Sequence, residues 1–189
     1  MTKPSAALGN TQAVTATSDV TPENCGDLGI RIDRAGRWYY HGSPIRRQEM
    51  VCLFASMLSR REDGGFWLVT ADEMGRIEVE DAPFLAVEMF ACGSGRDMVV
   101  SFRTNVDEVV TVDAGHPLRM AWDAETERPV LYVHLRDGIE ARLTGPVYSE
   151  LISQAFEETG VEDGVGDDGQ YGLWSSGIFF PLRLATGCD

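Results

Sequence analysis

The sequence predicts an α+β protein with two strand-rich halves of related topology, each a small antiparallel sheet with one helix. Short segments of alternating apolar and polar residues recur along the chain, as expected for strands with one solvent-facing side. Two segments, near residues 44–60 and 145–156, instead repeat apolar residues at helical spacing. The predicted organisation is a disordered tail over residues 1–27, an N-terminal subdomain over 28–95 and a C-terminal subdomain over 96–189.

The predicted tail is polar, lacks aromatic residues and shows no periodicity, so it cannot offset the entropy of becoming ordered. The chain contains neither a secretory apolar core nor a segment of transmembrane length, which predicts a cytoplasmic protein. Its four cysteines are widely separated and form no C-x-x-C pair, so no zinc finger or dithiol redox site is expected.

The N-terminal half begins with a predicted hairpin of residues 30–33 and 37–40. Serine and proline at Ser43 and Pro44 favour a helix start, and the following apolar stripe predicts a helix buried on most of its circumference. That stripe contains Met50, Leu53, Phe54, Met57 and Leu58. Three strands are expected after it, over residues 66–70, 76–80 and 84–90.

The C-terminal half predicts an antiparallel meander followed by one helix. Its expected strands lie near residues 97–104, 108–113, 118–122, 130–135 and 139–143. A second amphipathic helix follows Gly145 and Pro146. The acidic, glycine-rich residues 157–170 lack the spacing of an EF-hand and are predicted to be a linker. The apolar residues 171–184 are expected to return as a final strand or docked segment.

Charge and motif content exclude several functions. The formal net charge of −14 disfavours duplex nucleic acid and anionic membranes as partners. Lys3 is the only lysine and lies in the tail, which disfavours a Schiff-base lysine, and a phosphate-binding loop is absent. The chain has no G-x-S-x-G or H-E-x-x-H motif, so serine hydrolase and zinc peptidase activities are disfavoured. We therefore expect no cofactor and no metal.

Two groups of residues suggest a site without specifying one. Five arginines near the first hairpin can form a basic pocket or can simply be solvated: Arg31, Arg34, Arg37, Arg46 and Arg47. His116 can act as a catalytic base if Asp113 or Asp81 lies beside it. Glu80 and Asp81 are adjacent, but neighbouring side chains of a strand point to opposite faces, so they are not expected to form a catalytic pair.

Four segments carry a family resemblance: GRWYYHGSPIRRQEMVCLFASML, LVT, VEDAPFLAVEM and FRTNVDEVVTVDAGHPLRM. Together they resemble the uncharacterised bacterial family DUF1285 over about residues 28–150. The resemblance implies a duplicated α+β core with a C-terminal half superficially similar to pleckstrin-homology folds. It also implies a ligand site at the interface of the halves, for a nucleotide-like molecule, and a role in signalling.

Six positions are assigned to that site through the resemblance: Arg46, Asp81, Phe84, Asn105, His116 and Arg119. Arginine can bind phosphate or carboxylate through two hydrogen bonds, Phe84 can stack on a planar ring, and Asn105 can recognise polar edges. Each of the six can equally be an interface residue that holds the halves together.

Three functions follow in order of preference. The first is a non-catalytic ligand-binding or sensor protein, supported by the missing catalytic motifs and by the arginines near the expected junction. The second is a protein-interaction adaptor that presents a sheet edge or its final Trp/Phe segment to a partner protein. The third is an enzyme, such as a hydrolase, that uses His116.

Overall fold

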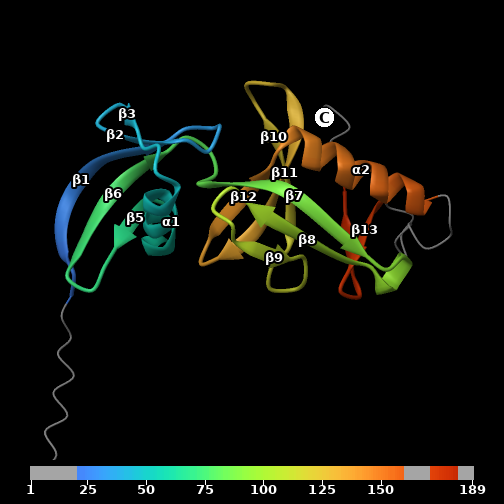
Figure 1. The fold of residues 1–189 in the computed structure, drawn as a ribbon. Helices are drawn as coiled ribbons and strands as arrows, with labels where there is room; N and C mark the ends of the chain where they lie inside the picture. The colour runs from blue at the N-terminus through green and yellow to red at the C-terminus, as the bar shows by residue number, and fades with distance from the viewer. Residues whose placement is uncertain (1–20, 160–170, 183–189) are drawn as a thin grey trace, which may run out of the picture.

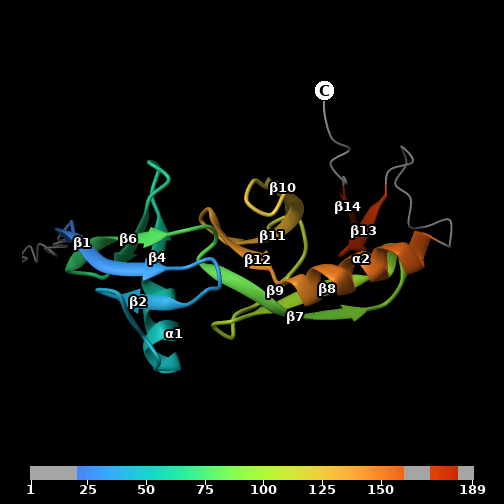
Figure 2. The same cartoon turned by 90° about the horizontal axis from the view of Figure 1, so that it is seen from above.

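The protein is elongated and consists of two lobes, as Figures 1 and 2 show. The structure, a computed structural model, describes residues 21–159 and 171–182. The N-terminal lobe contains a six-stranded sheet and helix α1, and the C-terminal lobe contains a second six-stranded sheet, helix α2 and a terminal hairpin. The predicted pairing of each sheet with one helix is therefore confirmed.

The first sheet has the strand order β3-β2-β1-β6-β5-β4. Its strands are β1 (Glu23–Ile32), β2 (Trp38–Tyr40), β3 (Ser43–Pro44), β4 (Leu58–Arg60), β5 (Phe66–Val69) and β6 (Glu73–Val79). The pair β1 and β6 is parallel and the other pairs are antiparallel. The prediction of a purely antiparallel sheet was therefore wrong, because period-two alternation does not distinguish the two directions.

Strand β1 begins earlier than expected. Glu23 and Asn24, assigned to the disordered tail, align with Glu73 and Met74 of β6. Backbone pairing with β6 holds this part of the strand. The side chains of residues 23–27 are exposed, so the sequence carries no apolar signal for a strand here. The remainder of the predicted tail, residues 1–20, lies outside the described residues.

Helix α1 (Gln48–Met57) differs from its prediction in its start and its burial. Ser43 and Pro44 do not cap it but form β3, which pairs with β2. The helix follows Arg47, which makes no side-chain capping bond. Of its stripe, Leu53 is 57% exposed, and the buried helical residues are Val51 and Ala55. This short helix therefore covers only part of the sheet.

The second sheet has the strand order β10-β11-β12-β7-β8-β9. Its strands are β7 (Phe84–Cys92), β8 (Val99–Thr104), β9 (Val109–Thr111), β10 (Leu118–Asp123), β11 (Arg128–Arg136) and β12 (Ile139–Leu143). Here β7 and β12 are parallel, so each sheet is mixed and contains a parallel pair. A short 3-10 helix, η1 (Gly95–Asp97), joins β7 to β8.

The border between the lobes falls before β7. The sequence prediction placed residues 84–92 in the N-terminal half, but β7 pairs with β8 and β12 of the second sheet. The residues of β7 do not indicate which of the two sheets the strand joins. The prediction therefore assigned it by its position in the chain, which was misleading. The segment that joins the lobes, residues 80–83, precedes it.

Helix α2 (Gly145–Thr159) lies beside β7, and the C-terminal segment, expected to be a final strand or docked segment, forms a hairpin. The hairpin strands are β13 (Gly172–Ser175) and β14 (Ile178–Pro181). The Ser175 hydroxyl donates to the carbonyl of Val112 at 2.7 Å and accepts from the Val100 N–H at 3.0 Å, which attaches the hairpin to the sheet. The predicted linker falls largely outside the described residues.

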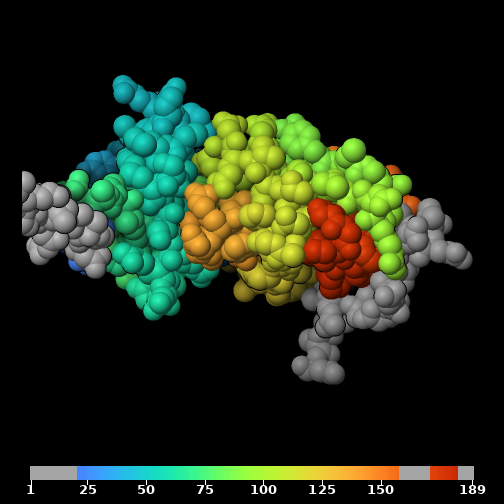
Figure 3. All heavy atoms as spheres, turned by 90° about the horizontal axis from the view of Figure 1, so that it is seen from below, coloured from blue at the N-terminus to red at the C-terminus, as the bar shows by residue number. Residues whose placement is uncertain are grey.

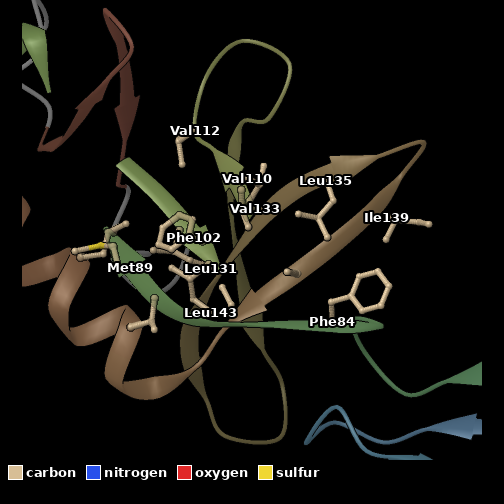
Figure 4. Packing of buried hydrophobic residues seen from close by; sticks show 14 of the residues in the cluster. Phe84, Met89, Phe102, Val110, Val112, Leu131, Val133, Leu135, Ile139 and Leu143 are labelled. Atoms are coloured by element: carbon tan, nitrogen blue, oxygen red, sulfur yellow. The ribbon is translucent and has the colours of Figure 1, made fainter. Parts of the chain in front are cut away.

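The hydrophobic core of the C-terminal lobe lies inside the curved second sheet. Figure 4 shows Phe84, Phe102 and Leu131 pointing into this interior. Phe84 is 0% exposed, so it packs in the core and cannot stack on a ligand in this structure, which corrects the predicted role. No helix within residues 21–159 and 171–182 combines the length and apolarity needed to cross a membrane.

Replacing Phe84 with alanine tests its place in the core. We expect Phe84→Ala to lower the free energy of unfolding by about 3 to 5 kcal/mol, because it removes a fully buried ring and leaves a cavity. Urea unfolding measures this loss. The control Val109→Ala, at a side chain 61% exposed, should change the value by less than about 0.5 kcal/mol. Equal effects of the two substitutions would contradict the assignment.

Candidate functional site

Asn105 fastens the two lobes together at their junction. Its side-chain oxygen accepts from the Leu85 N–H at 3.0 Å, and its amide nitrogen donates to the carbonyl of Gly36 at 3.3 Å. Gln48 at the start of α1 donates to the Asn105 carbonyl at 2.9 Å. A Cβ at Gly36 would lie 2.9 Å from the Asn105 amide, so this turn needs glycine to approach so closely.

Two arginines add contacts across the same seam. Arg136 donates to the carbonyl of Ala55 near the C-terminus of α1 at 2.9 Å while it pairs with Glu108 at 2.5 Å. Arg60 donates to the carbonyl of Gly138 at 3.0 Å. Figure 3 shows the atoms of the two lobes directly against each other on the face seen from below. These contacts add polar groups from both lobes to the seam.

A network of charged groups centred on Arg142 of β12 reaches across the seam through the contact of Asp123 with Arg34. The Arg142 guanidinium binds Asp81, in the segment joining the lobes, at 2.6 Å and Asp123, at the end of β10, at 2.9 Å. The Tyr132 hydroxyl donates to Asp81 at 2.8 Å, and Arg34 of the N-terminal lobe lies 3.3 Å from Asp123. The side chain of Asp123 is only 4% exposed, and that of Arg142 is 18% exposed.

This environment shifts the pKa values of Asp123 and Tyr132. Although burial opposes ionisation, backbone N–H groups of Glu125 and Thr126 and the guanidinium groups of Arg142 and Arg34 lower the pKa of Asp123 to about 2. Burial, together with the hydrogen bond to Asp81, raises the pKa of Tyr132 to about 12. At neutral pH Asp123 is therefore ionised and the Tyr132 phenol is neutral.

An open pocket of about 950 Å³ lies beside this network, and we call it the seam pocket. The N-terminal lobe contributes Arg34 and Ala35, from the turn between β1 and β2. The other lining residues come from the C-terminal lobe: Leu85, Asp123, Glu125, Thr126, Arg128, Pro129, Val130, Arg142, Leu143, Thr144, Gly145, Tyr148 and Ser149. The pocket thus joins both lobes, the turn between β10 and β11, and the N-terminus of α2.

The seam pocket is positively charged on an acidic protein. Its three arginines and two carboxylates leave one net positive charge, whereas the whole chain carries −14. Arg34 and Arg142 are paired with carboxylates, but the side chain of Arg128 makes no hydrogen bond or ion pair within the described part of the chain. Gly145 at the start of α2 is exposed, and the positive end of the helix dipole adds to the attraction for an anion.

A second, smaller pocket of about 380 Å³ lies beside Asp81. Asp81, Arg119, Tyr132 and Glu140 line it, together with Arg60, Phe66, Ala82, Pro83 and Gly138. Arg119 pairs with Glu140 at 2.6 Å and stacks over the Tyr132 ring at 4.3 Å. Two arginines and two carboxylates make this second pocket formally neutral.

The six positions assigned through the resemblance do not form one cluster. Asp81 and Arg119 lie together in the second pocket. Asn105 holds the lobes together, as one of the alternatives anticipated. Arg46 is exposed before α1 and makes no hydrogen bond or ion pair among the described residues. Phe84 is in the core.

Among the described residues, the His116 ring has no carboxylate partner of the kind that a catalytic base would need. Its Nδ1 lies 3.2 Å from the carbonyl of His134, and Asp113 accepts from its backbone N–H rather than from its ring. Asp81 is bound to Tyr132 and Arg142 instead. The geometry gives the proposed His116 mechanism no support.

The expected arginine cluster is dispersed, and only one member reaches the seam pocket. Arg31 pairs with Glu80, and Arg37 pairs with Asp33 at 2.9 Å. Arg34 alone among the five lines the seam pocket.

Sequence reasoning missed Arg128 and Arg142 as lining residues. Arg142 did have a signal, because it alternates with the buried Ala141 and Leu143 and so had to face away from the core. Arg128 follows a turn of exposed residues and had no signal in the sequence. Only the folding of β10 and β11 against the N-terminus of α2 brings it to the pocket.

Family models match almost all of the chain in two parts. Residues 17–82 match the N-terminal domain model of DUF1285, a domain of unknown function. Residues 83–182 match the corresponding C-terminal domain model. The border between the two models coincides with the segment that joins the lobes.

Two solved structures are similar to this chain. A DUF1285 family protein from Silicibacter pomeroyi DSS-3 shares 43% identity with a TM-score of 0.77, covering 86% of this chain and 83% of that one. A DUF1285 family protein from Shewanella baltica OS155 shares 25% identity with a TM-score of 0.54, covering 67% of this chain and 92% of that one. Among curated proteins, no match is found.

The lowered pKa of Asp123 predicts how the seam responds to acid. Because the fold lowers this pKa from 3.8 to about 2, ionised Asp123 stabilises the fold above roughly pH 4, and its contribution is lost as the pH falls through 2. Asp123→Asn should therefore be less stable than the wild type at neutral pH, and the difference should shrink in acid. The urea concentration at the midpoint of unfolding, measured for both proteins from neutral pH to about pH 2, tests this difference.

The matched control for this comparison is Glu125→Gln in the same pocket. The Glu125 side chain is 71% exposed, so its loss should change stability little at any pH. A difference between wild type and Asp123→Asn that stays constant over the whole pH range would contradict the role given to the Asp123 charge.

Proposed function

The chain belongs to the DUF1285 family, and from that premise we propose that it is a non-catalytic binding protein whose ligand occupies the seam pocket. One observation carries the proposal: an open pocket with net positive charge lies between the two lobes of an otherwise acidic protein. Its volume of about 950 Å³ is that of a small-molecule site, since such sites span roughly 300 to 1,000 Å³.

The chemistry of the pocket favours an anionic ligand with an apolar or planar body. Arg128 has no competing carboxylate in the described part of the chain, so it can bind phosphate or carboxylate with two hydrogen bonds. Leu85, Val130 and Leu143 supply apolar surface for the rest of the molecule. A nucleotide-like ligand combines both features and is our preferred class.

A ligand in this pocket would contact both lobes at once. Arg34 belongs to the N-terminal lobe, whereas Arg128 and Arg142 belong to the C-terminal lobe. Binding would therefore favour the arrangement of lobes in which these arginines converge, and a ligand shifts an equilibrium only through such differential contacts. This supports a sensor role in signalling, with the C-terminal lobe serving as a pleckstrin-homology-like binding module.

A protein-interaction adaptor is the second candidate, and a specific observation favours one version of it. The final aromatic segment is committed to its own chain, because Trp174 is 8% exposed and Phe180 is 7% exposed. Strand β10, in contrast, is an edge of the second sheet and carries Trp122, which is 53% exposed. Any docking of a partner is therefore expected at the sheet edge.

Thermal unfolding with added ligands tests the seam pocket. We expect nucleoside phosphates at millimolar concentration to raise the melting temperature, because a ligand that binds only the folded state stabilises it by mass action. The matching nucleosides without phosphate should give a smaller shift. Arg128→Glu should abolish the shift without lowering the stability of the free protein, since Arg128 is exposed.

Arg46→Glu is the matched control for the charge change. Arg46 is also exposed, but it does not line the seam pocket, so this variant should retain the full shift. The proposal fails in its phosphate form if no nucleotide stabilises the wild type. It also fails if Arg46→Glu and Arg128→Glu reduce the shift equally, which would indicate non-specific attraction.

A further inference from the structure

The four edges of the two large sheets are not equivalent. In the first sheet the edges are β3, a two-residue strand that contains Pro44, and β4, a three-residue strand. In the second sheet β9 has three residues, but β10 has six. Short strands and proline are ordinary protections against edge-to-edge pairing. Strand β10 has neither.

The unpaired backbone groups of β10 follow from its register. Pro117 accepts a hydrogen bond from the His134 N–H, so residue 117 faces β11. The next residues pair without a register shift, from Leu118 opposite Val133 to Asp123 opposite Arg128. In an antiparallel ladder every second residue faces the neighbour, so Leu118, Met120 and Trp122 direct their N–H and C=O groups outward. Within the described residues, these outward-facing N–H and C=O groups have no hydrogen-bond partner.

The charged side chain in the middle of β10 does not protect this edge. Arg119 reaches inward across β11, where it stacks over Tyr132 and pairs with Glu140 through two hydrogen bonds of 2.7 and 2.6 Å. Meanwhile Leu118, Met120 and Trp122 share one face of the strand and are apolar. Figure 2 shows β10 on the side of its lobe opposite β7 and β8, without another labelled element beyond it.

We propose that β10 binds β10 of a second copy of this chain in an antiparallel pair around a two-fold axis, joining the two sheets into one. A two-fold axis perpendicular to the sheet keeps each face on the same side, so residues pair only with others of the same face. Centring the axis on Met120 aligns Leu118 with Trp122 of the second copy. This register uses all three outward-facing residues of each copy, and no other same-face register does so.

The chemistry of the paired strands suits this arrangement. In a two-fold pair the central residue lies opposite the same residue of the second copy, so a charged residue there would face a like charge. Here the central residue is Met120, which is uncharged. Leu118 and Trp122 form a continuous apolar contact, and Trp122 is 53% exposed in the single chain. The long-range repulsion between two acidic chains opposes association, so the dimer should tighten as salt screens it.

The dimer would place the two copies' sites near the shared edge. Arg119 lines the second pocket, and Asp123 lines the seam pocket, and both residues belong to β10. The proposal does not depend on either pocket being occupied. It is therefore tested on the ligand-free full chain.

Sedimentation velocity of the full chain over a concentration series measures the association. We expect a dimer whose dissociation constant rises about tenfold or more in Trp122→Lys, which removes the apolar contact and introduces a charged lysine at the sheet edge. Met120→Pro should act similarly, because proline deletes an outward N–H that the β11 ladder does not use. The control Val109→Lys, on the other edge strand of this sheet, should leave the dimer intact.

Amide hydrogen exchange of the same samples tests the register. The N–H groups of Leu118, Met120 and Trp122 should exchange more slowly in the dimer than in Trp122→Lys. A wild-type chain that stays monomeric at every concentration would overturn the proposal. So would a dimer that Trp122→Lys leaves unchanged, and this variant decides the question if Met120→Pro fails to fold.

Discussion

The arrangement of the two lobes depends on the guanidinium of Arg142, which is held between Asp81 and Asp123. The carboxylates come from separate places, the segment that joins the lobes and the end of β10, and Arg34 of the other lobe also reaches Asp123. Without Arg142, Asp81 would keep only the hydrogen bond from the Tyr132 hydroxyl and Asp123 would lose one of its two arginine partners, which is costly because both carboxylates are largely buried. The network thus links the covalent connection between the lobes to the wall of the seam pocket.

The same network explains why the seam pocket can attract an anion on so acidic a chain. Arg34 pairs with Asp123 and Arg142 pairs with Asp81. These ion pairs fix the positions of the two arginines but partly neutralise their charge. Arg128 is left without such a partner in the described chain and can respond to a ligand. Structural and binding duties are thereby divided among neighbouring arginines.

Much of the fold could be predicted because alternation and helical spacing are local signals. The strands at residues 118–122 and 139–143 and the helix beginning at Gly145 were placed within a residue or two. Pairing was not local: the alternation of β12 is the same whether its neighbour β7 runs parallel or antiparallel, and nothing in residues 84–92 marks the sheet they join. Early β1 was missed because backbone pairing holds its exposed residues.

The site was predicted less well for the same reason. Of the five arginines expected near the junction, only Arg34 lines the seam pocket, and Arg128 reaches that pocket only through the β10–β11 turn. Phe84 was given a stacking role through the family resemblance, whereas its ring packs fully in the core.

A double-mutant cycle on Asp81→Asn and Arg142→Met, measured by urea unfolding, tests the central role of the seam network most directly. The structure predicts a coupling energy of about 1 kcal/mol or more, because the two side chains share a bond that neither single variant retains. Additive effects, with coupling below about 0.5 kcal/mol, would show that Arg142 and Asp81 do not hold the lobes together.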